Sequence, residues 1–322
     1  AGITSVLGAA FTGDLGITAT SGPGIALKGE AMGLAVMAEL PIVIINVQRG
    51  GPSTGLPTKT EQSDLMQAMY GRNGEAPVPV LASSTPGDCF FAAYEACRIA
   101  VKYMTPVILL TDGYLANGSE PWQVPKVADL PDFDVSFADE SNLADGQFLS
   151  YSRDKKTLAR PWAIPGTPGL EHRIGGIETE DLTGNVSYDP DNHHYMVETR
   201  AKKVEAITNE IGPSEIFGNK SGELLILSWG GTKGACRSAT EALKADGKKV
   251  SHLHLRWINP FPKDLGEKLI KFKHILIPEI NYGQLIKIIR AEFLVDAQGL
   301  NQVRGKPISS SDIQDAANKL IG

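Results

Sequence analysis

Residues 42–58 have the sequence IVIINVQRGGPSTGLPT, and this stretch decides the class of the fold. The apolar run at residues 42–47 is typical of a parallel strand that is buried on both faces. A loop rich in glycine and proline follows it directly and carries one arginine, Arg49. Open α/β sheets bind ligands just outside the carboxyl ends of their strands, and a guanidinium suits a carboxylate or a phosphate. We therefore expect Arg49 to face an anion, with pairing to a local Asp or Glu as the alternative.

Strand and helix patterns alternate around this stretch, up to about residue 118. Strands are predicted at residues 17–20, 42–47, 78–82 and 107–110, and helices at residues 25–39, 61–70 and 85–104. The last helix has a clear start, because Thr85 is a capping residue and Pro86 suits the first helical position. Glu61 and Asp64 are explained by the favourable dipole at a helix start. The βα alternation predicts a doubly wound parallel sheet.

Residues 119–200 differ from the rest, because they contain many prolines and show little periodicity. Long irregular stretches inside compact domains are rare unless they are functional or wrap another surface. We interpret this stretch as a connector that lies over a partner domain or subunit. Its aromatic residues favour packing over the alternative of a flexible linker.

A second α/β pattern begins near residue 200. Its predicted strands are residues 224–228, 250–255 and 274–278, and its predicted helices are residues 197–211, 234–245, 263–272 and 283–294. We accordingly divide the chain into a first domain at residues 1–118, the connector at residues 119–200 and a second domain at residues 201–322.

The composition is that of an ordinary globular protein. The chain has 322 residues, 42% of them hydrophobic, and a net charge of −6, which supplies a core and disfavours a nucleic-acid surface. No apolar stretch reaches about 18 residues, so no membrane span is expected. Cys89, Cys97 and Cys236 do not cluster, which disfavours an iron–sulfur or zinc site in this chain and favours a cytoplasmic location.

Two other loops join a strand to a helix. Ser21, Gly22 and Pro23 precede the predicted helix at residues 25–39, where free amides favour a polar or anionic ligand. A simple tight turn is the alternative there. Residues 230–234 have the sequence GGTKG in the same setting, and we favour a structural turn over a phosphate site because the P-loop pattern is absent.

Two patterns suggest metal binding and are interpreted otherwise. Asp112, between Thr111 and Gly113, is only faintly similar to the Gly-Asp-Gly signature that holds magnesium and a diphosphate, because the first glycine is missing. The adjacent His193 and His194 are expected to point in different directions as hydrogen-bonded loop residues. We therefore predict no metal site in this chain.

Several stretches together resemble the α subunits of the 2-oxoacid:ferredoxin oxidoreductases, and most closely the 2-oxoglutarate type. They are TATSGPG (residues 18–24), VQRGGPSTGLPT (47–58), EQSDL (61–65), YGRNGE (70–75), LTDGY (110–114), RWINPFP (256–262) and PEINYGQL (278–285). The resemblance covers essentially the whole chain. It implies an α/β fold in which a pyrimidine-type domain of the thiamine-diphosphate-binding fold, with a doubly wound parallel sheet, precedes a transketolase C-terminal-like domain.

The resemblance also implies a reaction and its partners. These enzymes use thiamine diphosphate to decarboxylate a 2-oxoacid oxidatively, coenzyme A takes the acyl group, and electrons pass through iron–sulfur centres to ferredoxin. With 2-oxoglutarate the products are succinyl-CoA and CO2. The β subunit is expected to hold most of the cofactor with Mg2+, together with an iron–sulfur cluster. This chain is then expected in a hetero-oligomer with that subunit, or in a homodimer when isolated.

The same resemblance assigns residues to two loops. Arg49 matches the family arginine that binds the substrate carboxylate. Ser53 and Thr54 lie in the same loop and are expected to hydrogen-bond the substrate or the cofactor. The residues expected near the pyrimidine ring follow the first strand and are Ser21, Gly22 and Pro23.

One departure from the family limits these expectations. The family places its catalytic glutamate just before the position where this chain begins, at Ala1, so we expect no catalytic residue here and no activity from this chain alone. Pyruvate and branched-chain 2-oxoacids are the alternative substrates, because one arginine suits any 2-oxoacid carboxylate. A second carboxylate, as in 2-oxoglutarate, needs another cation, for which Lys59 and Arg72 are candidates. A non-catalytic scaffold that binds a partner subunit is the alternative class of function.

Overall fold

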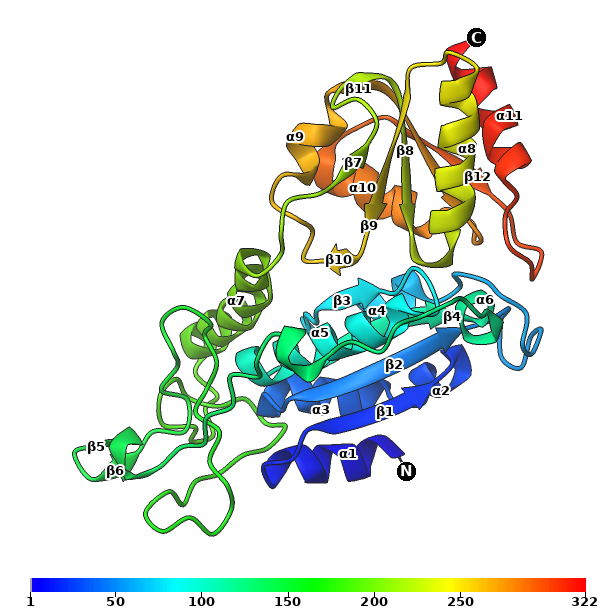
Figure 1. The fold of residues 1–322 in the computed structure, drawn as a ribbon. Coiled ribbons are helices and arrows are strands. Elements are labelled where there is room, and N and C mark those ends of the chain that lie inside the picture. Colours follow the sequence, from blue (N-terminus) through cyan, green and yellow to red (C-terminus); the bar gives the residue numbers. More distant parts are fainter. Residues whose placement is uncertain (1) are drawn as a thin grey trace.

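The protein is built around two five-stranded sheets, each with its own helices (Figure 1). The computed structural model describes residues 2–322. The chain opens with helix α1 (Gly2–Phe11), which packs against the first sheet. Ala1, which begins the predicted first domain, lies outside the described residues.

The first sheet has the strand order β1–β2–β4–β3–β10. Its strands are β1 (Gly16–Thr20), β2 (Ile42–Gln48), β3 (Val80–Ala82), β4 (Val107–Asp112) and β10 (Trp257–Asn259). The first four strands run parallel, as predicted, while β10 pairs antiparallel with β3. Because β10 comes from a distant part of the chain, residues beyond the connector complete the first sheet.

Helices cover both faces of this sheet, as expected for a doubly wound fold. Ile42 and Ile44 of β2 face α1 and α3, whereas Val43 and Leu109 face α5. The helices of this part are α2 (Gly22–Ala26), α3 (Gly29–Ala38), α4 (Leu65–Tyr70), α5 (Asp88–Tyr103) and α6 (Gly113–Asn117). Helix α5 begins three residues after the predicted start at residue 85, although the amide of Asp88 does donate to Oγ1 of Thr85 at 3.1 Å.

Two further helix predictions in the first domain were wrong in their bounds. The helix predicted at residues 25–39 is interrupted just before Gly29, a poor helix former. The helix predicted at residues 61–70 begins only at its fifth residue. Residues 61–64 instead lie against the second domain, where the Gln62 amide donates to the Ile280 carbonyl at 3.2 Å.

The connector is mostly irregular but is packed against the first domain. Its regular elements are β5 (Leu143–Ala144), β6 (Gln147–Phe148) and the 3₁₀ helices η1 (Val127–Asp129) and η2 (Glu140–Asn142). Nε1 of buried Trp162 donates to the carbonyl of Ala10 in α1 at 2.9 Å. The connector then leads into α7 (Pro190–Ala206), which begins earlier than the predicted residue 197 because Asp189 caps it and Pro190 opens it.

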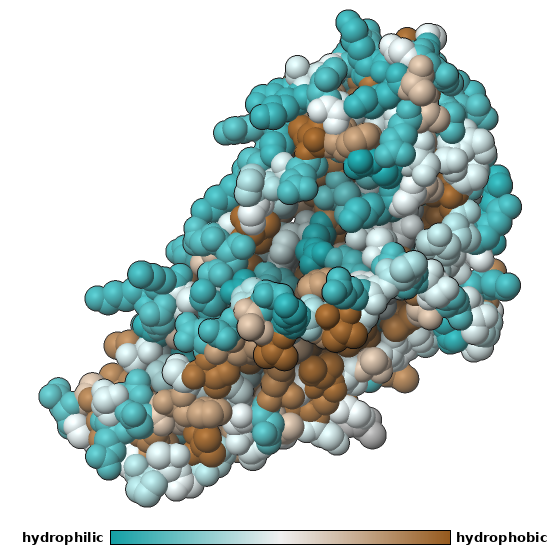
Figure 2. Space-filling model, in the orientation of Figure 1, coloured by the Kyte–Doolittle hydropathy of each residue, from teal (hydrophilic) through white to brown (hydrophobic). Residues whose placement is uncertain are grey.

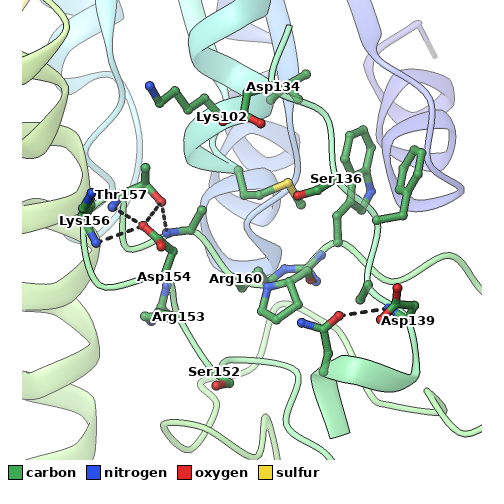
Figure 3. A pocket seen from close by; sticks show the side chains of 18 of the residues that line it. Lys102, Asp134, Ser136, Asp139, Ser152, Arg153, Asp154, Lys156, Thr157 and Arg160 are labelled. Atoms are coloured by element: carbon green, nitrogen blue, oxygen red, sulfur yellow. Dashed lines mark hydrogen bonds between the residues drawn. The ribbon is translucent and has the colours of Figure 1, made fainter.

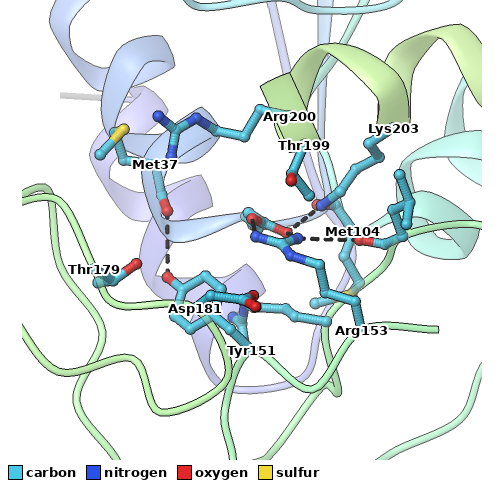
Figure 4. A network of polar contacts seen from close by, with 12 residues as sticks. Met37, Met104, Tyr151, Arg153, Thr179, Asp181, Thr199, Arg200 and Lys203 are labelled. Carbon is cyan, nitrogen blue, oxygen red and sulfur yellow. Dashed lines mark hydrogen bonds and ion pairs between the residues drawn. The ribbon is translucent and has the colours of Figure 1, made fainter. Parts of the chain in front are cut away.

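A buried ion network holds the connector and α7 to the end of α3. The carboxylate of Glu39 pairs with Arg153 at 2.5 Å and with Lys203. All three side chains are almost completely buried, and Figure 4 shows Arg153 and Lys203 converging on the carboxylate. Burial opposes ionisation of Glu39, but the charges of Lys203 and Arg153 outweigh it and lower the pKa of Glu39 to about 2.

The second sheet has the strand order β12–β11–β8–β9–β7. Its strands are β7 (Ile216–Phe217), β8 (Gly222–Trp229), β9 (Val250–Leu255), β11 (Phe272–Glu279) and β12 (Ala297–Asn301). Its helices are α8 (Lys233–Ala245), α9 (Leu265–Leu269), α10 (Gln284–Phe293) and α11 (Ser310–Ile321), with the 3₁₀ helix η4 (Gly230–Thr232). The 3₁₀ helix η3 (Ile207–Asn209) continues α7, and its Ile207 packs in the core beside the first sheet. Only β7 is antiparallel to its neighbour.

The short strands β7 and β10 were not predicted, and three further features of this domain differ from the prediction. The helix predicted at residues 263–272 ends at Leu269, because Phe272 already begins β11. The edge strand β12 was not predicted, since its sequence AQGLN has no β-branched residue. The final helix α11 was also not predicted, although the cap at Ser309 and the buried Ile313 and Ala317 gave a usable signal.

The surface differs between the two halves of the molecule. In Figure 2, apolar atoms gather over the first domain and the connector, while the second domain is mostly hydrophilic. Phe90, Phe91 and Trp122 are each about 40% exposed, and the Phe90 and Trp122 rings lie 5.4 Å apart. Among residues 2–322, no helix has the length and apolar character needed to cross a membrane.

Candidate functional site

The carboxyl end of β2 delivers Arg49 to the edge of the first sheet. Arg49 is half-buried, and its Nε is buried without a hydrogen-bond partner. Within the described part of the chain, no carboxylate pairs with its guanidinium, so the alternative of a local ion pair is not found there. A buried donor without a partner costs free energy. The side chain is therefore available for an anionic ligand.

The loop after Arg49 is a closed turn. The Gly50 amide donates to the Lys59 carbonyl at 2.8 Å, and the Leu56 amide donates to the Gly50 carbonyl at 2.9 Å. Ser53 and Thr54 lie exposed at the tip of this turn, and neither hydroxyl has a partner among the residues that the structure describes. Their hydroxyls are free to bind a ligand that covers the tip.

The turn at residues 21–23 lies at the same edge of the sheet. Thr20 of β1 is in register with Asn46 of β2, so the two parallel strands end side by side. A Cβ on Gly22 would come within 2.7 Å of Oδ1 of Asp64, so this turn packs tightly on that carboxyl group. Asp64 also accepts hydrogen bonds from Asn46 at 3.0 Å and Ser63 at 3.0 Å.

Asp64 connects the two predicted loops. Ser63, which bonds Asp64, also donates to the carbonyl of Arg49 at 2.8 Å. The Asp64 amide donates to Oε1 of Gln48 at 3.1 Å. Burial raises the pKa of Asp64. The structure thus brings Arg49 and the turn at residues 21–23 together through a buried carboxyl group that sequence reasoning had explained as a helix-dipole residue.

The segment that contains Asp64 also forms the junction between the domains. Gln62 is fully buried and donates from Nε2 to the Trp229 carbonyl at 2.8 Å. Its Oε1 accepts the Ile280 amide at 3.1 Å, and its carbonyl accepts Nδ2 of Asn281 at 2.8 Å. Gln284 adds bonds to the backbone of the same segment. Two of the quoted sequence stretches, EQSDL and PEINYGQL, are therefore the two sides of one interface.

Asp112 has a structural role at the end of β4. Its buried carboxylate accepts the Tyr114 amide at 2.8 Å and so caps α6. It also accepts Oγ1 of Thr60 at 3.0 Å and the Gly231 amide at 3.2 Å. Burial raises the pKa of Asp112. The GGTKG turn thus already binds a carboxylate of the first domain, which agrees with its interpretation as a structural turn.

The candidates for a second carboxylate-binding cation differ in availability. Arg72 donates to the carbonyls of Ala68 at 2.9 Å, Met69 at 2.8 Å and Ala76 at 3.0 Å, so its guanidinium is used at the end of α4. Lys59 is exposed and borders a shallow hollow of about 470 Å³ beside the arginine loop. Of the two candidates, only Lys59 is free of such bonds in the described chain.

The adjacent histidines lie in helix α7 and not in a loop as predicted, and each lies close to a carboxylate. Nδ1 of His193 lies 2.6 Å from Glu178, and Nε2 of His194 lies 3.4 Å from Glu198. No group of three His, Cys, Asp or Glu side chains that could hold a metal ion occurs in residues 2–322.

A cavity of about 790 Å³ lies between the end of α5 and the connector (Figure 3). Arg160 and Lys102 reach its wall, together with Asp154. The Asp154 carboxylate is held locally by the amides of Lys156 at 2.9 Å and Thr157 at 2.7 Å. This cavity is separate from the arginine loop.

Two family models match this chain. The model described as pyruvate flavodoxin/ferredoxin oxidoreductase, thiamine diP-bdg, matches residues 1–188. The model described as pyruvate:ferredoxin oxidoreductase core domain II matches residues 222–313. With the mainly parallel first sheet, these matches define an α/β protein of the thiamine-diphosphate-binding class, as the resemblance implied.

Individual relatives identify the family within this class. The 2-oxoglutarate oxidoreductase subunit KorA of Mycobacterium tuberculosis is 52% identical over 97% of this chain, which spans 47% of that relative. The 2-oxoglutarate synthase subunit KorA of Archaeoglobus fulgidus is 33% identical over 89% of this chain and 74% of its own length. The chain belongs to the α subunits of the 2-oxoacid:ferredoxin oxidoreductases.

A solved structure agrees with this assignment. The 2-oxoglutarate:ferredoxin oxidoreductase from Magnetococcus marinus, with 2-oxoglutarate, coenzyme A and succinyl-CoA bound, has a TM-score of 0.92 and 35% identity to this chain. The match covers 99% of this chain and 55% of that one. This chain therefore spans about half the length of several relatives that it matches.

Proposed function

We propose that this chain is part of the α subunit of an enzyme that oxidatively decarboxylates 2-oxoglutarate with coenzyme A. The products are succinyl-CoA and CO2, and the electrons go to ferredoxin. The observation that carries the proposal is Arg49, a cation at the carboxyl edge of the sheet whose buried Nε lacks a partner. The ligands named for the Magnetococcus marinus relative support the choice of substrate.

The residues at this edge fit thiamine diphosphate. Oδ1 of Asn46, within β2, and Nε of Arg49, just after the last residue of β2, are both buried without a hydrogen-bond partner, so both atoms can bind a ligand. The backbone of Ser21, Gly22 and Pro23 would hold the aminopyrimidine ring. When bound, thiamine diphosphate supplies the electron sink for decarboxylation. We assign its diphosphate, the Mg2+ and an iron–sulfur cluster to a β subunit.

The residues of this chain then bind and orient the substrate and the cofactor. Arg49 holds the carboxylate of the 2-oxoacid by charge-assisted hydrogen bonds, and Ser53 and Thr54 cover the ligand from the loop tip. Lys59 is the available cation for the second carboxylate of 2-oxoglutarate. Asp64 fixes the arginine loop relative to the turn at residues 21–23 through its bond with Ser63 and its contact with Gly22.

We further propose how the chain is organised in the enzyme. Residues 1–118 form the pyrimidine-binding domain, residues 119–200 the connector and residues 201–322 the transketolase C-terminal-like domain. The exposed aromatic group of Phe90, Phe91 and Trp122 supports a contact with the β subunit in a hetero-oligomer. The isolated chain would be inactive and would form a homodimer. The three free cysteines support a cytoplasmic location.

The test is an activity assay on the α subunit that contains this chain, co-expressed with its β partner. We expect 2-oxoglutarate to reduce ferredoxin or methyl viologen in the presence of coenzyme A. Arg49→Ala should lower kcat/KM at least roughly tenfold, since a lost charged contact costs about 1.5–3 kcal/mol. Faster turnover of pyruvate or of branched-chain 2-oxoacids would show that one of these, and not 2-oxoglutarate, is the substrate. Inactivity with every 2-oxoacid would favour the alternative function of a non-catalytic scaffold.

A further inference from the structure

A second cavity, of about 960 Å³, lies between the two domains and takes no part in the proposed reaction. Residues of α5 and the segment after β3 form one wall, and residues of β7, β9 and α8 form the other. In Figure 1 these elements face each other across the domain junction. The volume lies in the range of small-molecule sites, about 300–1,000 Å³.

Three cations line one end of this cavity. Arg237 pairs with Glu241 at 2.7 Å, and Arg256 pairs with Asp88. The third cation is different, because Lys233 has no carboxylate partner in the described chain and donates only to the Ser84 hydroxyl at 3.2 Å. Since Ser84 follows β3, the lysine also bridges the two domains.

Two imidazoles lie beside these cations. His252 and His254 both bond the Ser228 hydroxyl, at 2.7 and 2.8 Å, and both line the cavity. Nε2 of His254 is buried without a partner. Burial, together with the charges of Arg237 and Lys233, lowers the pKa of His252 to about 4. Neutral imidazoles beside uncompensated positive charge favour an anionic ligand.

The carboxylates that line the cavity do not neutralise the positive charge at this end. Glu95 and Glu210 line the wall but both pair with Arg98, and Glu210 also pairs with Lys102. Glu215 is the remaining carboxylate of the wall and is exposed.

The rest of the wall is apolar and aromatic. The aromatic residues available to a ligand are Phe91 and Tyr94 of α5, with Leu130 and Pro131 from the connector beside them. Trp257 is almost fully buried, and the guanidinium of Arg237 covers the ring of Phe217. Aromatic faces of this kind bind planar rings by stacking. The wall thus combines a cationic end with a surface for a flat ring.

We propose that this cavity binds a nucleotide. Its phosphates lie against Lys233, Arg256 and the two imidazoles, and its base stacks on the aromatic residues. The Gly231 amide, which lies just before α8, does not bind the phosphates because it already donates to Asp112. This site is independent of the arginine loop and of the reaction proposed there.

The experiment is a titration of the purified chain with ADP, pyrophosphate and adenosine by calorimetry. We expect ADP to bind more tightly than either of its parts, and Lys233→Met to weaken ADP binding at least roughly tenfold. Lys319→Met, an exposed lysine on α11 away from the cavity, should leave the affinity unchanged. Coenzyme A, a co-substrate of the proposed reaction, carries the same adenosine diphosphate group, so tighter binding of coenzyme A than of ADP would overturn the independence of this site from that reaction.

A second readout shows where the nucleotide binds. The Cε1–H signals of His252 and His254, assigned with single His→Gln variants, should shift on addition of ADP in the wild type and should shift less in Lys233→Met. Thermal melts check that each variant is folded. Absence of ADP binding overturns the proposal, and so does binding that leaves both histidine signals unmoved. Equal affinity for pyrophosphate and ADP overturns the role of the aromatic wall.

Discussion

The carboxylate of Asp112, at the end of a first-sheet strand, accepts the amide of Gly231 in the second domain at 3.2 Å. One buried carboxylate therefore caps a helix in its own domain and receives a turn of the other. The relative position of the two domains is consequently fixed by directional bonds as well as by apolar packing. Predictions about the junction follow from this arrangement.

Asp112→Asn should destabilise the protein by about 1–3 kcal/mol. The carboxylate serves Thr60, Tyr114 and Gly231 as acceptor, and an amide group offers only one oxygen to these donors. Urea unfolding measures the free energy difference. The control is Asp315→Asn, which changes an exposed carboxylate on α11. An equal effect in both variants would show that charge, and not the junction, is responsible.

Gln62→Ala should loosen the contact between the domains. The substitution leaves the amide of Ile280 buried without its partner, at a cost of about 1–3 kcal/mol, and removes one of the two donors to the Trp229 carbonyl, which keeps its bond from Thr232. Limited proteolysis should cut the variant faster between the domains than the wild type. Gln123→Ala, at an exposed connector position, is the matched control. Unchanged proteolysis of Gln62→Ala would contradict the role of this side chain.

Gly22→Ala should disturb the candidate site more than it disturbs the fold. A Cβ at this position would press on Oδ1 of Asp64 at 2.7 Å, and Asp64 bonds the residue that holds the arginine loop. We expect a higher KM for the 2-oxoacid in the assembled enzyme, with a small change in unfolding free energy. Gly8→Ala on α1 has open space and should be neutral or stabilising by about 0.5–1 kcal/mol. A variant with wild-type KM would remove Gly22 from the site.

The Glu39 network makes stability depend on pH in the acid range. The folded pKa of Glu39 is about 2, below its ordinary value of 4.5. A depressed carboxyl pKa contributes stability that is complete above the unfolded pKa and is lost as the pH falls from about 4.5 towards 2. Urea unfolding at pH 6 and at pH 3 should therefore show a loss at pH 3.

The matching variant is Glu39→Gln, which leaves Arg153 and Lys203 buried without their carboxylate. It should cost about 3–5 kcal/mol at pH 6 and lose less stability than the wild type between pH 6 and pH 3. Glu171→Gln, at an exposed connector position, is the control. An identical pH dependence in Glu39→Gln and wild type would show that other groups govern the acid range.

Patterns in the sequence predicted those structural features that depend on residues close together in the chain. The apolar run of β2 has one physical explanation, burial on both faces, and its direction places Arg49 at the sheet edge. The role of Asp64 was different, because a carboxylate before a helix is explained equally well by the helix dipole. The contacts of Asp64 come from Asn46, Gln48 and Gly22, and those of Gln62 come from a segment about 218 residues later in the chain. Sequence periodicity carries no information about such a contact.

The role of Arg72 also depends on contacts that the sequence does not show. As a cation near a predicted ligand site, Arg72 is a reasonable candidate for binding a carboxylate. In the structure, its guanidinium donates to three carbonyls near the end of α4. Whether an arginine is free depends on nearby backbone geometry, which composition does not reveal. For Arg49 the structure supplied what the sequence lacked, a buried Nε without a partner.

Strand β10 gives the molecule a topology that a linear map of domains conceals. Trp257 pairs with Leu81, and the amide of Ala82 donates to the carbonyl of Arg256 at 2.8 Å. The chain therefore leaves the first sheet, builds part of the second and returns before finishing it. Cutting the polypeptide once, anywhere between the two sheets, would strip a strand from the first sheet and leave β3 with an open edge. The two halves are separate in space but are interlocked along the chain.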